Sequence, residues 1–258
     1  MQPMTSNPIG LWTLYSREVR RFAKVYTQTL LAPVVTTMLF LAVFTLALGG
    51  LRPDVHGVPF SQFLGPGLVM MAIAQNAFAN TSSSIMISKI QGNIVDTLMP
   101  PLTSAELVAG YAGGGLTRGI CVGVVVTAAM SLVVQMTITD IVMVLYHGVA
   151  ASLMMSLIGV AAGVWAEKFD HMQSVTNFVI TPLAFLSGTF YSIDRLPETF
   201  QIIAHFNPFF YMIDGFRSGF IGHSDTAPWI GVTVMAGTNL ALWFLCHRLF
   251  ESGYKLKS

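Results

Sequence analysis

The chain of 258 residues has the composition of a protein embedded in lipid. Only 10% of its residues are charged, against about 25% in a typical soluble domain, whereas 53% are hydrophobic. Its 13 Lys and Arg and 12 Asp and Glu are too few to cover such a body with a water-facing surface. The net charge of +1 gives no indication of a nucleic-acid partner. We therefore expect an all-α integral membrane protein, with one transmembrane domain over residues 1–258.

The first expected element is a basic amphipathic helix over residues 9–27. Tyr15 and Phe22 belong to an aromatic series with helical spacing, and Arg20 and Arg21 lie on the other side. This pattern predicts a helix that lies along the cytoplasmic headgroups. The alternatives are an irregular tail and a twin-arginine export signal. A full-length apolar run without a clear small-residue cleavage site follows, which favours a retained anchor.

Six stretches match the roughly 20 apolar residues that one bilayer crossing needs. The first ends at Gly49-Gly50, and the third is long enough that we expect it to tilt or to lie partly in the interface. These spans are expected at about residues 29–48, 62–83, 107–135, 141–165, 172–191 and 229–249.

The distribution of Lys and Arg between the expected loops indicates the orientation. With six spans, both termini share one side. Nine basic residues lie on that side and three on the other, so both termini are expected in the cytoplasm. The nine are Arg17, Arg20, Arg21, Lys24, Lys89, Lys168, Arg248, Lys255 and Lys257, and the three are Arg52, Arg195 and Arg217.

A short amphipathic helix is predicted over residues 85–99, on the cytoplasmic side between the second and third spans. Pro100-Pro101 ends it, and Thr103 with Glu106 has the spacing of a capping box for the next helix. Such a helix can dock a partner or merely close a hairpin, and periodicity alone does not choose between the two. Its apolar positions are Ile87, Ile90, Ile94 and Leu98, and its polar positions include Lys89, Gln91, Asn93 and Asp96.

The longest outer connection, residues 192–228, is rich in aromatic residues and has few charges. Asn207 and Pro208 suit the start of a helix, and a loop this apolar is expected to dip back into the outer leaflet as two short helices. Asp214 and Arg217, three positions apart, are expected to form a structural ion pair. The alternative is a seventh short span.

The sequence predicts no catalytic residues, cofactor or metal site. It lacks a GxxxxGK[ST] phosphate loop, an HExxH pair and a GxSxG elbow, and its six His residues have no ligand spacing. Cys121 and Cys246 suggest no disulfide framework. No expected span carries an acidic residue near its centre, which argues against an ion-coupled transporter.

Mildly polar side chains in two spans are candidates to line a translocation path. Asn76 and Asn80 are four residues apart in the second span, and Asn177 and Thr181 in the fifth. The same residues can instead form helix-to-helix hydrogen bonds worth about 0.6 kcal/mol each. The residues alone leave both interpretations open.

Small residues in the third and fourth spans predict close helix packing. Gly115, Gly119 and Gly123 are spaced by four, as are Gly159 and Gly163. Arg118 stands within the first series, where its charge must pair, face a wet cleft or snorkel to the cytoplasmic boundary. We expect it to snorkel, because the third span has residues to spare.

The order of these elements resembles the type-2 ABC transporter permeases. Residues 92–104 are similar to that family's coupling segment, with Asp96 where Glu is commoner and Thr103 after Pro-Leu. Residues 187–217 contain Ser-Gly, Leu-Pro, Asn-Pro and Tyr-x-x-Asp-x-x-Arg in the family's order. The resemblance covers essentially the whole chain.

The resemblance implies an export permease of the bacterial inner membrane that has no ATPase site of its own. Two copies would pair, each docking a separate ATP-binding subunit, and export drugs, lipids, polysaccharides or lipo-oligosaccharides. It favours docking by residues 85–99 over mere hairpin closure. The residues it assigns to coupling are Ile87, Ile90, Gly92, Asn93, Ile94, Asp96 and Leu98.

Two other functions are weaker alternatives. A membrane-embedded lipid-handling enzyme or assembly scaffold would use the apolar outer loop to hold lipid. A secondary transporter would need the intramembrane carboxylate that the spans lack.

Overall fold

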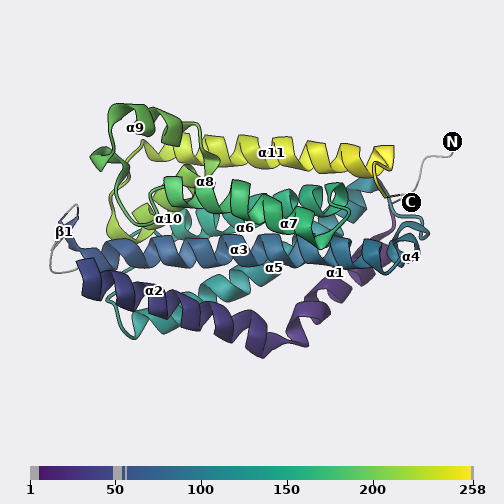
Figure 1. The fold of residues 1–258 in the computed structure, drawn as a ribbon, viewed down its shortest axis with the longest axis horizontal. Helices are drawn as coiled ribbons and strands as arrows, with labels where there is room; N and C mark the ends of the chain where they lie inside the picture. The colour runs from purple at the N-terminus through teal and green to yellow at the C-terminus, as the bar shows by residue number, and fades with distance from the viewer. Residues whose placement is uncertain (1–5, 49–53, 56, 257–258) are drawn as a thin grey trace.

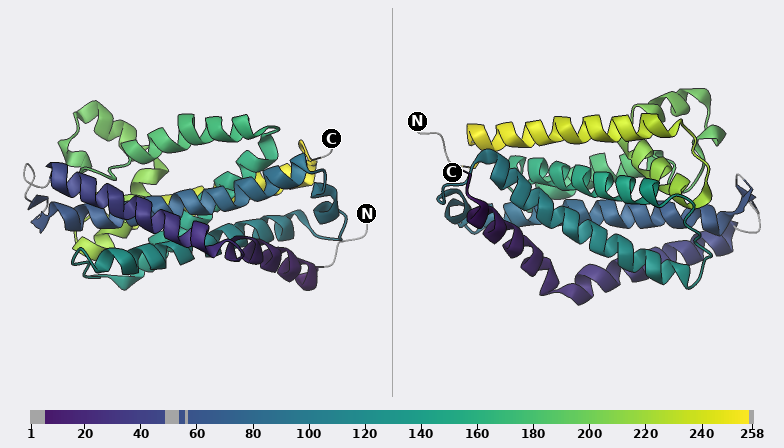
Figure 2. Two further views of the ribbon diagram at one scale, coloured as in Figure 1. Left: turned by 60° about the horizontal axis from the view of Figure 1, so that its bottom comes forward. Right: turned by 180° about the vertical axis from the view of Figure 1, so that it is seen from behind.

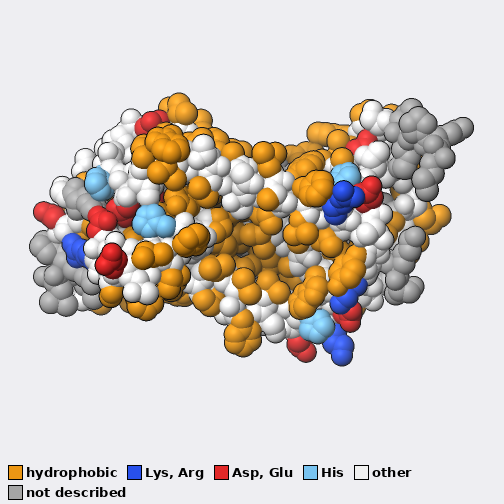
Figure 3. Space-filling view, turned by 90° about the horizontal axis from the view of Figure 1, so that it is seen from above, with side chains coloured by type: hydrophobic (Ala, Val, Ile, Leu, Met, Phe, Trp, Pro, Cys, Tyr) orange, Lys and Arg blue, Asp and Glu red, His pale blue; other side chains and the backbone are white. Residues whose placement is uncertain are grey.

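The computed structural model describes residues 6–48, 54–55 and 57–256 as a bundle of long helices. Gly49, Gly50, Arg52 and Lys257, to which the sequence analysis assigned a span end and loop charges, lie outside the described residues. The axes of the long helices are roughly aligned with one another (Figure 1). Charged side chains gather near the two ends of the molecule (Figure 3). The middle of the face in Figure 3 is hollowed and lined by hydrophobic side chains.

Helix α3 (Phe60–Ile90) is the central element of the bundle. It packs most extensively against α6 (Ile141–Trp165) and α5 (Ser104–Ser131), and α11 (Pro228–Ser252) covers α6 from the other side. The sequence explains the start of α5, because Thr103 and Glu106 form the expected capping box. Asp140 starts α6 by accepting hydrogen bonds from two backbone amides of its first turn.

Glycines let α5 and α6 approach α3 at backbone distance. A Cβ on Gly159 would lie 2.6 Å from the carbonyl oxygen of Phe78, and one on Gly163 would lie 3.1 Å from that of Ser82. On α5, a Cβ on Gly115 would lie 3.0 Å from the carbonyl oxygen of Ala77. The spaced glycines therefore act as the sequence predicted, as contact points between helices.

Among the described residues, four helical stretches are long and apolar enough to cross a membrane. The expected second span lies within α3, a continuous helix that runs the length of the bundle (Figure 1). Polar side chains interrupt its apolar sequence. The expected fifth span is a broken helix. The count of six therefore stays a prediction. The four stretches are Thr27–Ala47, Ser104–Ser131, Ile141–Trp165 and Pro228–Ser252, and the broken helix comprises α7 (Phe169–Val175), the π-helical η2 (Thr176–Ile180) and α8 (Thr181–Leu186).

Helix α1 (Pro8–Ala23) is shorter than the helix predicted over residues 9–27. The chain bends after it and continues through the π-helical η1 (Thr27–Leu31) into α2 (Ala32–Leu48). Figure 2 shows α1 and α2 along the outside of the bundle with this bend between them. The described chain begins α1 and ends α11 at the same end of the bundle (Figure 1), as an even number of crossings requires.

The other end of the bundle carries the β-hairpin and the helices of the connection after residue 192, whereas α4 lies at the end where α1 begins (Figure 1). The hairpin of β1 and β2, whose Val55 and Val58 pair in antiparallel register, was not predicted from the sequence. Two helices do occupy the connection expected over residues 192–228, and the amide of Phe209 donates to the capping side chain of Asn207 at 3.0 Å. These elements are β1 (Asp54–Val55), β2 (Val58–Pro59), the 3₁₀ turn η3 (Ile193–Arg195), α9 (Glu198–His205) and α10 (Pro208–Ile221).

The expectation of one helix over residues 85–99 is wrong. Helix α3 continues to Ile90, the chain turns, and a separate five-residue helix, α4 (Ile94–Leu98), follows. Gly92 has a φ of +74° at the turn, a conformation that glycine adopts without steric cost. The expected third span also ends early, because α5 stops at Ser131 rather than at residue 135.

The close approach of α6 to α3 predicts a specific sensitivity to side-chain size. Replacing Gly159 by Leu should lower the free energy of unfolding by about 1–3 kcal/mol or more, because the new side chain meets the α3 backbone. The matched change Gly237→Leu on α11 should be tolerated, because a Cβ there would have no neighbour within 4 Å. Thermal unfolding in detergent, followed by tryptophan fluorescence, measures both. Equal losses for the two variants would contradict this account of the packing.

Candidate functional site

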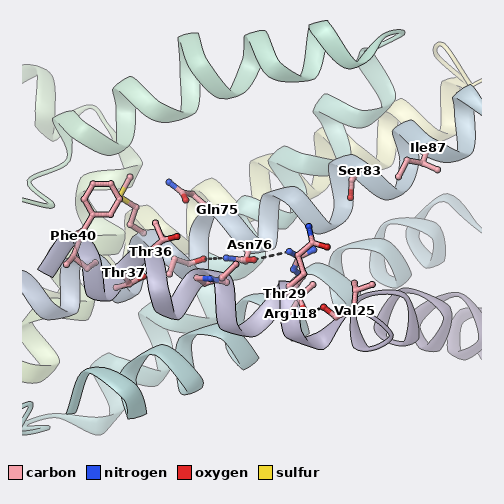
Figure 4. Close-up of a pocket in the computed structure, with 16 residues that line it drawn as sticks. Val25, Thr29, Thr36, Thr37, Phe40, Gln75, Asn76, Ser83, Ile87 and Arg118 are labelled. Atoms are coloured by element: carbon pink, nitrogen blue, oxygen red, sulfur yellow. Dashed lines mark hydrogen bonds between the residues drawn. The ribbon is translucent and has the colours of Figure 1, made fainter. Parts of the chain in front are cut away.

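A cavity of about 620 Å³ opens between α2, α3 and α5. Figure 4 shows that its polar lining comes from four segments, with hydroxyl groups from η1 and α2, amides from α3 and one guanidinium from α5. Val25, Phe40 and Met71 add an apolar wall. The main polar lining residues are Thr29, Thr36, Thr37, Gln75, Asn76 and Arg118.

Arg118 lines this cavity rather than snorkelling to the cytoplasmic boundary as the sequence suggested. Its Nη2 donates a hydrogen bond of 2.9 Å to Oδ1 of Asn76 (Figure 4), and the Nδ2 of Asn76 donates to the carbonyl oxygen of Ala72. The side chain points inward because the cavity offers space and because the amide oxygen of Asn76 on α3 is within hydrogen-bonding distance. Asn76 therefore lies at the cavity, as expected of a path residue.

A second cavity, of about 590 Å³, lies on another side of α3. Gln75 lines both cavities, and Thr176 of η2 contributes to the second as Thr29 of η1 does to the first. Each cavity thus has a π-helical segment in its wall, and such segments are often found at functional sites. The remaining polar lining of the second cavity is Ser82, Ser83, Asp170 and Gln173.

The other three predicted path residues do not line either cavity. Asn80 is fully buried, and its Oδ1 accepts a hydrogen bond of 3.1 Å from Arg21 of α1. Asn177 is exposed on η2 and accepts a hydrogen bond of 3.1 Å from Gln173. Thr181 is half-buried at the start of α8. Within the single chain, Asn80 therefore joins two helices.

A buried carboxylate, Glu18, attaches α1 to the bundle. Its Oε1 accepts a hydrogen bond of 2.8 Å from Ser84 on α3, and its carboxylate lies 3.3 Å from Arg17 and 3.4 Å from Arg21. Sequence reasoning missed Glu18, although a signal was available. Glu18 follows Leu14 and precedes Phe22 by four residues, and these three form the buried face of α1.

The cytoplasmic surface expected at residues 85–99 consists of α4 and the turn before it. Ile94 is buried and Leu98 packs partly against the same cluster, so these two hold α4 in place. Ile90 and Val95 are each 51% exposed and Met99 is 76% exposed. Sequence reasoning missed Val95 and Met99, because it expected one helix with a different exposed face. The remaining predicted coupling residues, Ile87, Gly92, Asn93 and Asp96, lie at the surface or on its edge.

A groove of about 350 Å³ adjoins α4. Lys89, Val95 and Glu167 line it together with Lys255 near the end of the described chain. The Nζ of Lys255 lies 2.7 Å from the carboxylate of Glu167, and this hydrogen bond lowers the pKa of Glu167. Lys89 donates to the carbonyl oxygens of Val164 and Ala166 at the end of α6, both at 2.6 Å. The groove therefore has fixed charges beside an exposed apolar surface.

Asp214 and Arg217 do not form the direct ion pair that the sequence suggested; among the described residues their hydrogen bonds go elsewhere. Arg217 donates to the carbonyl oxygens of Gly188 (2.7 Å) and Thr189 (3.2 Å), and its guanidinium lies 3.9 Å from the ring centre of Phe63. Each side chain points toward a different loop. The partners of Asp214 are the Ser224 hydroxyl (2.7 Å), the Asp225 amide (2.9 Å) and the Thr226 hydroxyl (3.0 Å).

Polar cavities beside a central helix, inside a bundle with an apolar exterior, are features of a membrane transport protein. The family model of the ABC-2 type transporters matches residues 10–221. That match covers most of the chain, and the chain belongs to this family, as its resemblance to type-2 ABC permeases implied.

Curated relatives include proteins from several bacteria. The chain is 38% identical over 250 residues to an inner membrane transport permease, YadH, of Escherichia coli K12, covering 97% of this chain and 98% of the relative. It is 25% identical over 221 residues to nodulation protein J of Rhizobium leguminosarum bv. trifolii, covering 84% of this chain and 82% of the relative. The chain is thus a transport permease by family, a transport component rather than an enzyme.

The buried contacts of Glu18 predict that it stabilises the attachment of α1. Glu18→Ala should lower the free energy of unfolding by about 2 kcal/mol, because Ser84 and two guanidinium groups lose their partner and the two arginines remain partly hydrated. The control is Glu251→Ala, which removes a glutamate 3.3 Å from Arg248 at the exposed end of α11 and should have almost no effect. Denaturant unfolding in detergent compares them, and a Glu18 variant as stable as the control would refute the attachment.

Proposed function

We propose that the chain is the permease subunit of an ATP-driven exporter in the bacterial inner membrane. It forms the translocation path and couples to a separate ATP-binding subunit. The observation that carries the proposal is the exposed apolar surface that Val95 and Met99 form at α4. This surface lies next to the end of α3, the helix that lines both polar cavities. The name of the Escherichia coli relative, a transport permease of the inner membrane, supports the assignment of transport and membrane.

A chain of contacts links the α4 surface to the cavities. The guanidinium of Arg17 on α1 donates to Thr97 of α4 at 2.9 Å. Glu18, next along α1, accepts from Ser84 of α3 at 2.8 Å, and α3 carries Gln75 between the two cavities. A displacement of α4 by a docked subunit would therefore be transmitted to α3 through these hydrogen bonds, in addition to the short turn of residues 91–93 that joins the two helices.

The energy for transport would come from the partner subunit. The sequence carries no GxxxxGK[ST] loop to cradle phosphates, so ATP hydrolysis is assigned to the docked chain. The groove beside α4 offers that chain an apolar surface together with Lys89, Glu167 and Lys255. Fixed charges around an apolar contact are suited to setting the register of an interface.

A homodimer would complete the path in this proposal. Residues 27–47 expose a stripe of large apolar side chains, which lipid or a second copy would cover. Asn177 and Thr181 lie on the broken helix of η2 and α8 and would line the path only beside a second chain. The exposed stripe consists of Leu31, Val35, Leu39, Val43 and Leu46.

The orientation follows from the basic residues. The end that carries α1 and α4 holds most of the Lys and Arg, so this end would face the cytoplasm, with both termini there. Six crossings would result if α3 and the broken helix of residues 169–186 also span the membrane. The aromatic helices α9 and α10 would then lie at the outer leaflet.

The docking surface makes a direct prediction. The double variant Val95→Glu with Met99→Glu should reduce the amount of ATP-binding subunit that co-purifies with the chain by at least about tenfold, because two charges would be buried without partners. The matched control, Leu132→Glu with Val133→Glu, places the same two charges on side chains that are 86% and 71% exposed, just beyond the end of α5 that lies away from α4. It should leave co-purification unchanged.

Quantitative immunoblotting of the purified complexes measures the ratio of the two subunits. If the double variant retains its partner, docking at α4 is wrong. If the unaltered chain purifies from its own host without any ATP-binding subunit, the proposed function is wrong.

A further inference from the structure

We propose that the cavity between α2, α3 and α5 binds the anionic phosphate group of an amphipathic molecule, and that Arg118 contacts this group. The proposal rests on the proposed export function, since it names the chemical class of the cargo. Three observations carry it: an arginine without a counter-ion, polar groups placed around it, and an apolar wall in the same cavity.

Arg118 is a cation without an anionic partner in the described part of the chain. It forms no salt bridge with the described residues, and the residue to which it is hydrogen-bonded, Asn76, is neutral. The charge that acts on it is the guanidinium of Arg21, which has the same sign. The buried Nε of Arg118 has no hydrogen-bond partner. A guanidinium at this depth requires an anion or water around it, and five donors in a planar fork match the oxygens of a phosphate.

The cavity around Arg118 suits the two ends of an amphipath. Thr36, Thr37 and Gln75 supply hydroxyl and amide groups that can donate to a phosphate (Figure 4). Phe40 and Leu68 form part of the wall and offer apolar contacts to a chain or ring. The volume of about 620 Å³ lies within the range of ordinary small-molecule sites, about 300–1,000 Å³.

A groove with an excess of basic side chains leads from the cavity to the end that carries α1. This groove, of about 730 Å³, shares Val25 and Ile87 with the cavity. Its charged lining is Arg17, Arg20, Arg21 and Lys24 against the two carboxylates of Glu18 and Asp96. Cationic side chains along a groove attract anions and raise their local concentration. An anionic headgroup would thus reach Arg118 from the end assigned to the cytoplasm.

The test uses the purified full-length chain in nanodiscs of neutral lipid, without ATP or a partner subunit. The probes are two fluorescent single-chain lipids, lysophosphatidic acid, which is anionic, and lysophosphatidylcholine, whose net charge is zero. The original chain should bind the anionic probe at least tenfold more tightly than the zwitterionic one. Arg118→Gln should remove this preference and leave the affinity for the zwitterionic probe unchanged, whereas Arg118→Lys should keep most of it.

A second variant tests the same site without deleting the arginine. Asn76→Asp places a carboxylate where the structure has the amide oxygen 2.9 Å from Arg118, so the cation gains an internal partner. This variant should also lose the preference for the anionic probe while folding normally. The control Arg248→Gln removes a charge from the exposed end of α11, outside the cavity, and should change neither affinity.

Three results would overturn the proposal. The first is an unchanged preference in Asn76→Asp, and the second is an equal loss for both probes in Arg118→Gln, which would assign Arg118 a purely structural role. The third is complete displacement of the anionic probe by inorganic phosphate at equal concentration, which would indicate a site for the free ion. Because no ATP-binding subunit is present, any of these results leaves the export function to be judged by its own co-purification test.

Discussion

The structure depends on how closely its helices approach one another in an environment where burying apolar surface from lipid gains little. Glycines on α5 and α6 bring these helices to the backbone of α3, so that packing and hydrogen bonds replace the hydrophobic effect as the source of cohesion. Thr81 of α3, for example, donates to the carbonyl oxygen of Ser156 on α6 at 2.9 Å. This tight core lets α3 carry polar side chains elsewhere along its length without losing its place.

The polar side of α3 then separates structural from candidate functional roles. Asn80 and Ser84 face α1 and are hydrogen-bonded to Arg21 and Glu18, respectively. Gln75 and Asn76, by contrast, line cavities. Four residues along one helix therefore divide between fixing a neighbour and facing space that a ligand can fill. Spacing in the sequence does not reveal this division, because it depends on which helix lies opposite.

The sequence was sufficient for features that arise from local patterns. The capping box at Thr103, the helix start at Asn207 and the packing role of Gly159 all follow from neighbouring residues, and the family follows from motifs. Features that depend on tertiary contacts were missed or wrong. In the sequence, Glu18 belongs to a basic helix, and only the structure places it against Ser84. Arg118 points inward, toward an acceptor on Asn76 of another helix. The break at Gly92 makes Val95 and Met99 the exposed apolar positions.

The two π-helical segments have a geometric consequence for the cavities that they border. A π-turn holds one residue more than an α-turn, and each residue of a helix accounts for about 100° of rotation. Passing that surplus residue along the helix would therefore rotate a cavity wall and exchange the side chains it presents, without unwinding the backbone. The surplus residue in η1 therefore turns α2 about its axis relative to an uninterrupted helix, and so decides which side chains of α2, Thr36 and Thr37 among them, line the first cavity.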